Sequence, residues 1–529
     1  MANREHKINS LVVKKVTKRG FSVNQMRQSV TKRIEVYISR NNTFWFKLAK
    51  KQCSERKHKK RLSMKVNSTL LSVALGLSGC LTEAIFSYVP LNAQVSDQAA
   101  DAFFIENVRI IIGDGNVIEN GFLEIENGLI ETVSAGTLEN NEGKISIDGQ
   151  GKTIMPALID GHSHLGYQGR SSWGSQNYGK QNLIDNLEQY AYYGFSAVFS
   201  AGSDAPNIIN SVENARQDGE FVGAQVLYAA GMAPSGQGPN DQFLSHALAV
   251  EEEVSETILY GLENPEQARK QVRAASANGI KFIKIWVDDR GGSQRKLSPP
   301  IYEAVIEEAE NLSLKVFVHQ QFASDMPGLL SAGAHGFLHG RIGQDFDSDI
   351  ANQTSASGAF IIPNWGLAEL RQEAIGEDSF LSDIFTDEEM QPLMVGNNSR
   401  QTALRRDSVS EAGRVASFLG LIDAGVDIVL GTDAGAVPDH PFGYTGHREL
   451  EIYVRLGMTP MQAIVAGTHN AAHHLGLEFK GELKPGFSAD IILLEQNPLE
   501  DIRNTRSIER VFLAGVEVDR SRLKDKWKP

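Results

Sequence analysis

His162 and His164 stand one residue apart at the end of a short apolar run, residues 154–159. On a β-strand, residues two apart point to the same side, so both imidazoles would aim at one point, as two ligands of one metal ion must. Two ordinary polar residues leaving a strand would look the same. Asp160 and Gly161 favour the metal interpretation, because they suit a chain that turns from a buried strand into a loop, and active sites collect at the carboxyl ends of barrel strands.

Four more polar residues end, or nearly end, apolar segments further along the chain: Lys284, His319, His339 and Asp433. Each alone has an ordinary structural explanation, such as a core histidine, an Asp that caps a helix, or a Lys whose ammonium group reaches the surface. Taken with the H-x-H pair, however, they repeat one pattern, which predicts a shared site where several strands end.

Strand-like runs alternate with helix-like ones through the middle of the chain, which is typical of βα units and a parallel sheet. The runs number eight, enough to close a (β/α)₈ barrel of the TIM type, and they fall at 154–164, 196–200, 225–229, 280–286, 315–319, 336–339, 359–363 and 427–433. A long loop is expected over 232–264. Short alternating segments near both ends of this body predict antiparallel strands, so a small β-sandwich domain would be formed by both termini.

Charge divides the front of the chain from the rest. Residues 1–63 hold 18 Lys or Arg and 3 Asp or Glu, so the remaining chain is more acidic than the net charge of −13 indicates. An acidic body favours solubility and argues against a nucleic-acid surface. The basic head could be a nucleic-acid arm or a solvated tail. We favour a third interpretation, in which Met64 is the real start and residues 1–63 are upstream sequence translated by mistake.

The stretch after Met64 predicts export. Lys65 and the apolar residues 69–77 have the order and length of a signal peptide, and residues 77–80 resemble a bacterial lipobox with Cys80 as the lipidated residue. We therefore expect a periplasmic protein, or a lipoprotein anchored to a bacterial membrane at Cys80.

Five regions follow from these patterns: a basic head (1–63), a signal-peptide and lipobox region (64–93), the first part of the β-sandwich (94–150), the barrel (151–475) and the second part of the β-sandwich (476–529). The two cysteines, Cys53 and Cys80, both precede the folded regions. Imidazole and carboxylate are therefore the expected metal ligands, and no disulfide framework is expected.

The chain resembles the amidohydrolase superfamily, which comprises metal-dependent hydrolases built on a (β/α)₈ barrel with a side β-sandwich. The resemblance covers roughly residues 102–520. Its most specific parts are residues 156–164, Gly431-Thr432-Asp433 and the tail segment 481–490. Ala157 departs from the family, which usually has glycine there, and this departure changes no ligand.

The resemblance implies a site in the prolidase and imidazolonepropionase group that holds two divalent ions, with Zn²⁺ as the expected metal. The ligands that it implies are His162, His164, Lys284, His319, His339 and Asp433. The H-x-H pair would bind the more buried ion and the two later histidines the second. Lys284 would be a carbamylated lysine that bridges both ions. Physics supports this role, because a free ammonium is costly at a buried cationic site, whereas CO₂ converts the amine into an anionic ligand with two oxygens.

The expected function is hydrolysis of a C–N bond of the amide or peptide type by a metal-bridging hydroxide, in a small substrate such as a dipeptide or an N-acyl amino acid. Asp433 would accept the proton of the attacking water and return it to the leaving amine. If Lys284 is a plain lysine, the site would be mononuclear, as in the deaminase-like and imidazolonepropionase-like branches that act on cyclic amides or amidines. A non-catalytic scaffold of the same fold would have lost ligands, and none is missing here. Homo-oligomer formation stays open.

Four further residues are candidates for contact with the substrate: Tyr167, Trp286, Arg341 and His447. The first three closely follow ligands and could line the pocket or simply pack the loops. Arg341 could meet a carboxylate through two hydrogen bonds. His447 could contact the substrate or cap a helix.

Overall fold

The computed structural model describes residues 102–137, 145–320, 322–339, 346–370, 375–394, 411–438 and 440–528. The predicted basic head and export region, residues 1–93, lie outside these ranges, and so does Arg341. Within the described ranges, no helix is long and apolar enough to cross a membrane.

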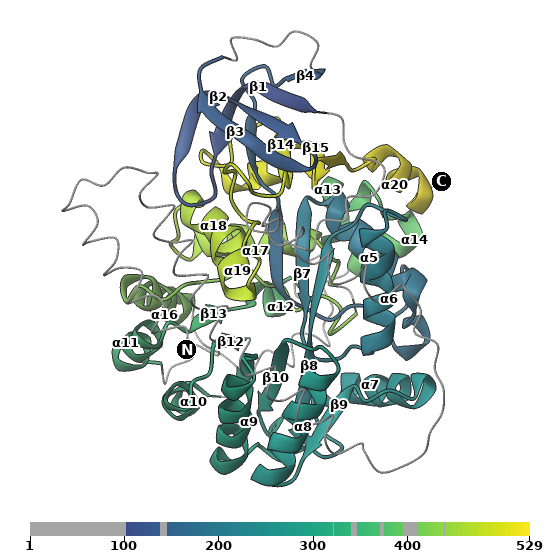
Figure 1. Ribbon diagram of the computed structural model, residues 1–529, viewed down its shortest axis with the longest axis vertical. Helices are drawn as coiled ribbons and strands as arrows, with labels where there is room; N and C mark the ends of the chain where they lie inside the picture. Colours follow the sequence, from purple (N-terminus) through teal and green to yellow (C-terminus); the bar gives the residue numbers. More distant parts are fainter. Residues whose placement is uncertain are drawn as a thin grey trace, which may run out of the picture. The chain divides into compact units, whose positions relative to one another are not determined.

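Parallel strands form the barrel, and each pairs with its neighbour along the sheet (Figure 1). They are β6 (Leu158–Ser163), β7 (Phe195–Ser200), β8 (Gln225–Pro234), β10 (Phe282–Val287), β11 (Lys315–Gln320), β12 (Gly336–Leu338) and β13 (Phe360–Ile362). Residues 427–434 fill the eighth place, because Ile428 bridges to Ile361 of β13 and Ala434 bridges to Ser163 of β6. The predicted (β/α)₈ barrel is thereby confirmed.

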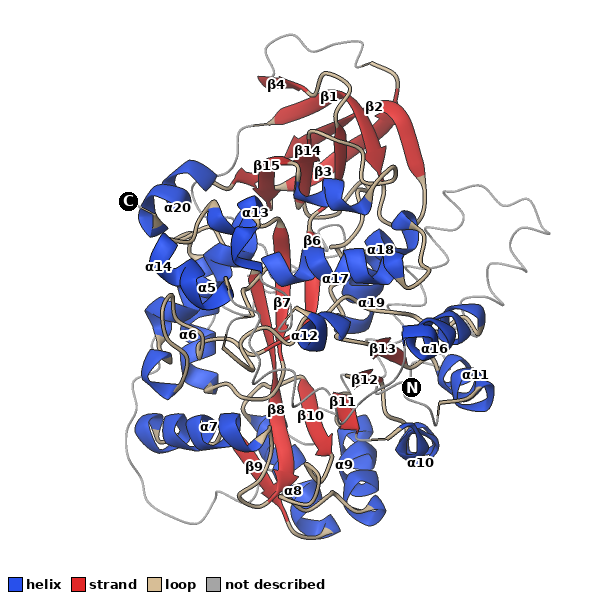
Figure 2. Cartoon of the chain, turned by 180° about the vertical axis from the view of Figure 1, so that it is seen from behind, coloured by secondary structure: helices blue, strands red, loops and turns tan. Residues whose placement is uncertain are grey.

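Helices follow the strands and cover the outside of the barrel (Figure 2). They are α5 (Lys180–Tyr192), α6 (Pro206–Gln217), α8 (Pro265–Ala277), α9 (Pro299–Asn311), α10 (Met326–Ala332), α11 (Ser348–Ser357), α16 (Glu411–Asp423) and α17 (Tyr444–Arg455). A proline in the first turn starts α6, α8 and α9, where its missing N–H costs no hydrogen bond. Shorter helices complete the chain: α12 (Trp365–Glu369), α13 (Ser379–Ser382), α14 (Asp387–Met390), α18 (Pro460–Gly467), α19 (His469–Leu475) and α20 (Arg520–Trp527).

The expectation of a long loop over 232–264 is wrong. β8 extends to Pro234, helix α7 spans Asp241–Val254, and strand β9 (Leu259–Leu262) pairs in parallel with β8. Asn240 starts the helix, since its side chain accepts a hydrogen bond from the amide of Phe243.

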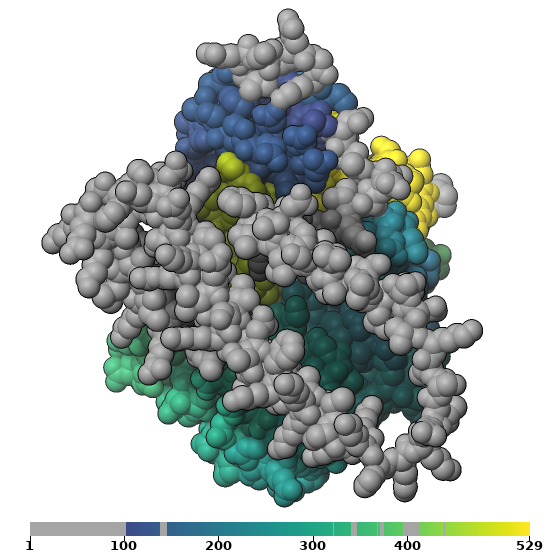
Figure 3. Space-filling view, viewed as in Figure 1, coloured from purple at the N-terminus to yellow at the C-terminus, as the bar shows by residue number. Residues whose placement is uncertain are grey.

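A second sheet is formed by strands from both ends of the described chain. Its order is β16-β15-β14-β5-β1-β2-β3, with β4 paired to β1. The strands are β1 (Phe103–Ile111), β2 (Val117–Glu126), β3 (Leu129–Ala135), β4 (Ile145–Asp148), β5 (Thr153–Pro156), β14 (Ile491–Leu494), β15 (Ile508–Leu513) and β16 (Val516–Glu517). Figure 3 shows purple-to-blue N-terminal residues of this domain beside yellow-green C-terminal ones. The small β domain built from both termini is therefore present, and its strands connect as one sheet.

Aromatic rings fill the barrel below the strand ends. Phe317 contacts Phe199, Phe282 and Phe360 with ring centroids 5.2, 5.6 and 5.0 Å apart. Residues of α19 belong to the same apolar cluster and cover the barrel at the end opposite the carboxyl ends of the strands. Since side chains alternate along a strand, the residue two positions after Phe317, His319, also faces the interior, nearer the carboxyl end.

Candidate active site

Five of the six predicted ligands lie at or just beyond the carboxyl ends of barrel strands, and Lys284 lies in the middle of its strand. His162 is in β6 and His164 directly follows it, Lys284 is in β10, and His319 is in β11. His339 follows β12, and Asp433 lies in the segment that closes the barrel. Parallel strands end at one rim, so the fold brings these side chains to the same face of the barrel.

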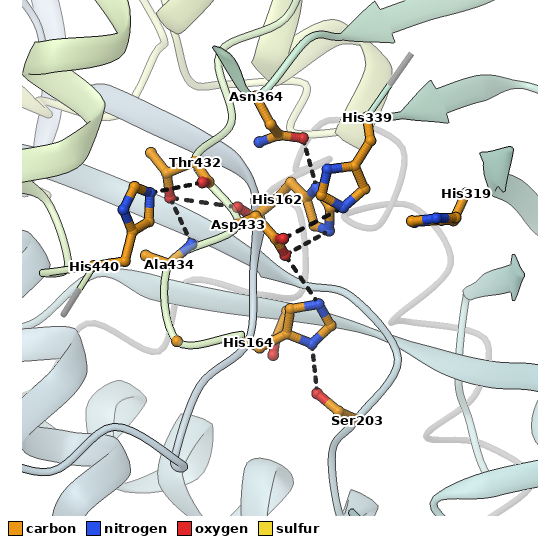
Figure 4. Close-up of polar contacts among 12 residues, drawn as sticks. His162, His164, Ser203, His319, His339, Asn364, Thr432, Asp433, Ala434 and His440 are labelled. Carbon is orange, nitrogen blue, oxygen red and sulfur yellow. Dashed lines mark hydrogen bonds and ion pairs between the residues drawn. The ribbon is translucent and has the colours of Figure 1, made fainter. Parts of the chain in front are cut away.

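Three imidazoles surround the carboxylate of Asp433 (Figure 4). Its Oδ1 lies 3.3 Å from Nε2 of His162 and 3.3 Å from Nε2 of His164, and its Oδ2 lies 3.4 Å from Nε2 of His339. Single donor atoms of His162, His339 and Asp433 all lie within 4.8 Å of one another. The geometry therefore gathers nitrogen and carboxylate donors around one small volume.

Hydrogen bonds on the far side of two rings fix their orientation. Nδ1 of His162 lies 2.9 Å from Oδ1 of Asn364, and Nδ1 of His164 lies 2.7 Å from Oγ of Ser203. Because a side-chain carbonyl oxygen can only accept, the proton of His162 is on Nδ1, and the lone pair of Nε2 faces Asp433. Outer hydrogen bonds of this kind are typical of histidines that bind metals.

A divalent cation fits this donor set. Among the described residues, Nε2 of His162 and Oδ1 of Asp433 are buried and have no hydrogen-bond partner. Burial, with Lys284 adding to the effect, holds the pKa of His162 well below 6.5, so the ring stays neutral and offers no proton to the carboxylate. Two electron-rich atoms 3.3 Å apart are then best satisfied by a shared cation, and imidazole with carboxylate is the ligand set that Zn²⁺ prefers.

Asp433 is an ionised carboxylate. Burial opposes its ionisation, but His162, His164 and Lys284 together lower its pKa below the usual 3.8. Its backbone has a positive φ of 60°, and His339 and Asn364 share this conformation with φ values of 64° and 50°. Such backbone costs energy for residues other than glycine and collects at functional sites, where the surrounding structure maintains it.

Lys284 is 1% exposed. Burial lowers its pKa to about 7, with Arg290 adding to the effect and Asp433 opposing it. Its Nζ lies 6.0 Å from the ring centroid of Trp286, two residues on along the same strand. A large fraction of this amine is therefore neutral at physiological pH.

His319 faces a different partner. Its Nε2 lies 2.8 Å from Oδ2 of Asp288 and 3.1 Å from Nη1 of Arg290, while its ring centroid lies 4.8 Å from that of His339. Figure 4 shows it beside His339 but apart from His162, His164 and Asp433. The structure thus brings five of the six predicted residues into one electrostatic group and places His319 at its edge, paired with Asp288.

The predicted substrate contacts do not lie together. Tyr167 is fully buried and donates a hydrogen bond to the carbonyl of Ser203, so it supports the loop behind His164 and does not line a pocket. Trp286 is 3% exposed and packs beside Lys284.

His447 fits the helix-capping alternative, because one of its ring nitrogens meets the carbonyl of Tyr193, the residue at the C-terminal end of α5. It is fully buried on α17, and its two ring nitrogens lie 2.9 Å from Oγ1 of Thr505 and 2.8 Å from the carbonyl oxygen of Tyr193. Both nitrogens are therefore used in packing. The predicted contact through Arg341 lies outside the described residues.

Sequence reasoning missed the residues that hold the ligands in place. Asp160 is buried and accepts hydrogen bonds from the amides of His162 and Thr432, from Oγ1 of Thr432 and from the hydroxyl of Tyr190. It therefore ties the first barrel strand to the segment that carries Asp433. Gly431 is required beside it, since a Cβ there would lie 2.5 Å from Ile362. The sequence signal that could have indicated this contact is the pair of segments D-G-H-x-H and G-T-D, which contain Asp160 and Thr432.

Known proteins share this architecture. The amidohydrolase family matches residues 153–518. Ochratoxinase of Aspergillus niger is 26% identical over 429 residues, covering 74% of this chain and 81% of that protein. Imidazolonepropionase of Thermoplasma volcanium is 22% identical over 428 residues, covering 75% and 90%. The solved structure of a Xaa-Pro dipeptidase with bound methionine superposes with a TM-score of 0.62 at 22% identity, covering 79% of this chain and 99% of that one.

Proposed function

The chain belongs to the amidohydrolase family and is a hydrolase of C–N bonds, and from that premise we propose that it cleaves the amide bond of a dipeptide or an N-acyl amino acid with two divalent metal ions. The names of two relatives, a Xaa-Pro dipeptidase and ochratoxinase, support a substrate of this size. His162, His164, His339 and Asp433 would hold metal, with Lys284 and His319 completing the second site.

Lys284 carries the proposal of two ions. Its side chain is buried on a barrel strand and its pKa is lowered to about 7, so the nucleophilic neutral form of the amine is accessible. The nitrogen lone pair can attack CO₂, and loss of one proton then leaves a carbamate whose single negative charge is shared by two oxygens. Such a group neutralises excess positive charge and can bridge two ions about 3.5–4 Å apart.

The chemistry needs a nucleophile, a proton carrier and a polarised carbonyl. Divalent ions bound at this site would lower the pKa of water and polarise the scissile carbonyl. Asp433, held ionised by its neighbours, accepts the proton of the attacking water and delivers it to the leaving nitrogen. Asn364 and Ser203 keep the H-x-H pair aimed at this carboxylate throughout.

A mononuclear hydrolase of cyclic amides or amidines is the second candidate. The observation that favours it is the pairing of His319 with Asp288 and Arg290, which leaves the tightest donor group at His162, His339 and Asp433. The relative named imidazolonepropionase adds to this case.

Metal analysis and substrate screening decide between the candidates. The chain is produced with bicarbonate and Zn²⁺, dialysed, and assayed for metal per chain. It is then screened against dipeptides, N-acyl amino acids and cyclic amides. About two ions per chain with release of an amino acid supports the proposal. One ion, unchanged by bicarbonate, with activity on cyclic amides alone would make the mononuclear enzyme the better account.

A further inference from the structure

Glu449 is a buried acid with no place in the chemistry described above. It lies on α17 with none of its surface exposed. Its Oε1 accepts a hydrogen bond from the amide of Trp365 (2.7 Å), and its Oε2 accepts one from the amide of Gly366 (2.5 Å). These amides are the first two of α12, where a helix has N–H groups without partners inside the helix.

The residue before that helix is Asn364, which orients His162. Asn364 is 5% exposed, has a φ of 50° and places its Oδ1 2.9 Å from Nδ1 of His162. Two hydrogen bonds therefore connect Glu449 to the metal-facing imidazole. The first is donated by the amide of Trp365, the second involves the side chain of Asn364, and one peptide bond joins these two residues.

Helix α12 cannot hold this geometry alone. It has five residues, far fewer than an isolated helix needs, and its preceding residue is in a left-handed conformation. Binding two successive amides with both carboxyl oxygens fixes the position and the tilt of the first turn. Gly366 permits this approach, since a Cβ at that position would lie 2.6 Å from Oε2 of Glu449.

We propose that Glu449 is a positioning residue for the metal site, which acts through the start of α12 and Asn364 to keep the Nε2 lone pair of His162 facing Asp433. α17 follows the last barrel segment, and α12 follows β13. The contact thus connects three parts of the barrel rim that the sequence keeps far apart. The inference rests on the proposed metal site at His162.

Metal affinity measures this role directly. Apo-protein is titrated with Zn²⁺ against a competing chelator for the wild type and for Glu449→Gln, Asn364→Ala and Gly366→Ala. In Glu449→Gln an NH₂ group would face a backbone N–H. In Gly366→Ala the added methyl group displaces the carboxyl group without removing it. Each variant should bind the tight ion about 10–100-fold more weakly, the loss typical for outer partners of ligating histidines.

The double variant Glu449→Gln/Asn364→Ala should bind no more weakly than Asn364→Ala, because both changes cut the same path. Glu451→Gln is the matched control. Glu451 lies on the same helix but pairs with Arg448 and Arg506, so its replacement should leave affinity unchanged.

The outcomes separate this inference from the proposed function. A wild type that binds no divalent ion refutes the proposed function. The inference is overturned if the wild type binds Zn²⁺ and Glu449→Gln or Gly366→Ala lowers the melting temperature without changing the Zn²⁺ affinity. Glu449 would then have a structural role only. If Glu449→Gln does not fold, Gly366→Ala decides by the same criterion.

Discussion

Lys284 lies in the middle of β10, between Ile283 and Ile285, and burial lowers its pKa to about 7. An ammonium there would repel bound cations, whereas a carbamate would attract them. Under the proposed function, the charge carried by this one side chain would determine how many ions the site can hold.

Replacement of Lys284 tests that role. Lys284→Ala should lose the second ion and at least about 100-fold of the turnover, since a ligand shell is sensitive to the loss of one member. Acetate or propionate added in trans should restore part of both by supplying two oxygens. Lys284→Arg should not respond to them, because a guanidinium keeps its charge and fills the space. Metal per chain and rate are measured together. Two ions and normal turnover in Lys284→Ala would contradict the binuclear mechanism.

Asp433 should respond differently from Lys284. Asp433→Asn retains an oxygen that can contact metal but cannot accept the proton of water. Turnover should fall by about 10²–10⁴-fold while most of the metal stays bound. Loss of metal and activity in equal measure would instead make Asp433 mainly a ligand. The measurement is the same pair of metal analysis and rate, with Asp427→Asn as a control because Asp427 pairs with His474 on α19, away from the site.

At the residue scale, the sequence indicated which candidate ligands would lie close together, but it did not indicate the residues that orient them. His162 and His164 are two positions apart, so strand geometry alone aims them together. Asn364, in contrast, is 202 positions from His162. Its hydrogen bond to His162 depends on a left-handed φ that no local sequence pattern indicates. The surroundings of His447 could not be predicted for a related reason. Its fully buried place beside Thr505 arises from packing between distant segments.

At the element scale, the barrel interior determines whether the rim is held rigidly. Phe317 touches three other phenylalanine rings directly below His319. This packing sets the spacing of β7, β10, β11 and β13 under the site. A cavity there would let the strands shift and would move the ligands with them.

Phe317→Ala should therefore cost about 3–5 kcal/mol of unfolding free energy, since the side chain is fully buried. Phe479→Ala is the control. Phe479 is 49% exposed, and its loss should change stability by less than about 0.5 kcal/mol. Urea unfolding followed by circular dichroism gives both values. Equal midpoints for the two variants would show that the rings under the site do not support the barrel.

Strand and helix order was readable from the chain, but one helix was overlooked. The eight apolar runs could be predicted because each repeats a strong local signal. The segment 241–254 lies inside the predicted loop but forms a helix, in which Phe243, Ala247 and Val250 recur at helical spacing and are buried. The acidic end of that segment obscures its apolar stripe.

At the scale of the whole molecule, two strands of the β domain contribute side chains to two hydrophobic cores. Along β14, Ile491 and Leu493 belong to the core of the β domain, whereas Ile492 and Leu494 belong to the large core that includes the barrel helices. β5 pairs with β14 and divides in the same way, with Ile154 in the first core and Met155 in the second. Both faces of these strands are therefore buried, each against a different part of the protein.

This sharing predicts that the described chain unfolds in one transition. Ile491→Ala and Ile492→Ala remove the same side chain at adjacent positions from opposite faces, and each residue is fully buried, so each should cost about 2–5 kcal/mol. If the cores are coupled, both variants shift the same urea transition, seen equally by circular dichroism and by tryptophan fluorescence. All the described tryptophans lie outside the β-domain core, so fluorescence reports on the rest of the molecule. The opposite result would be two separate transitions, of which Ile491→Ala shifts only the transition that fluorescence does not detect. That result would show that the small domain folds independently of the barrel.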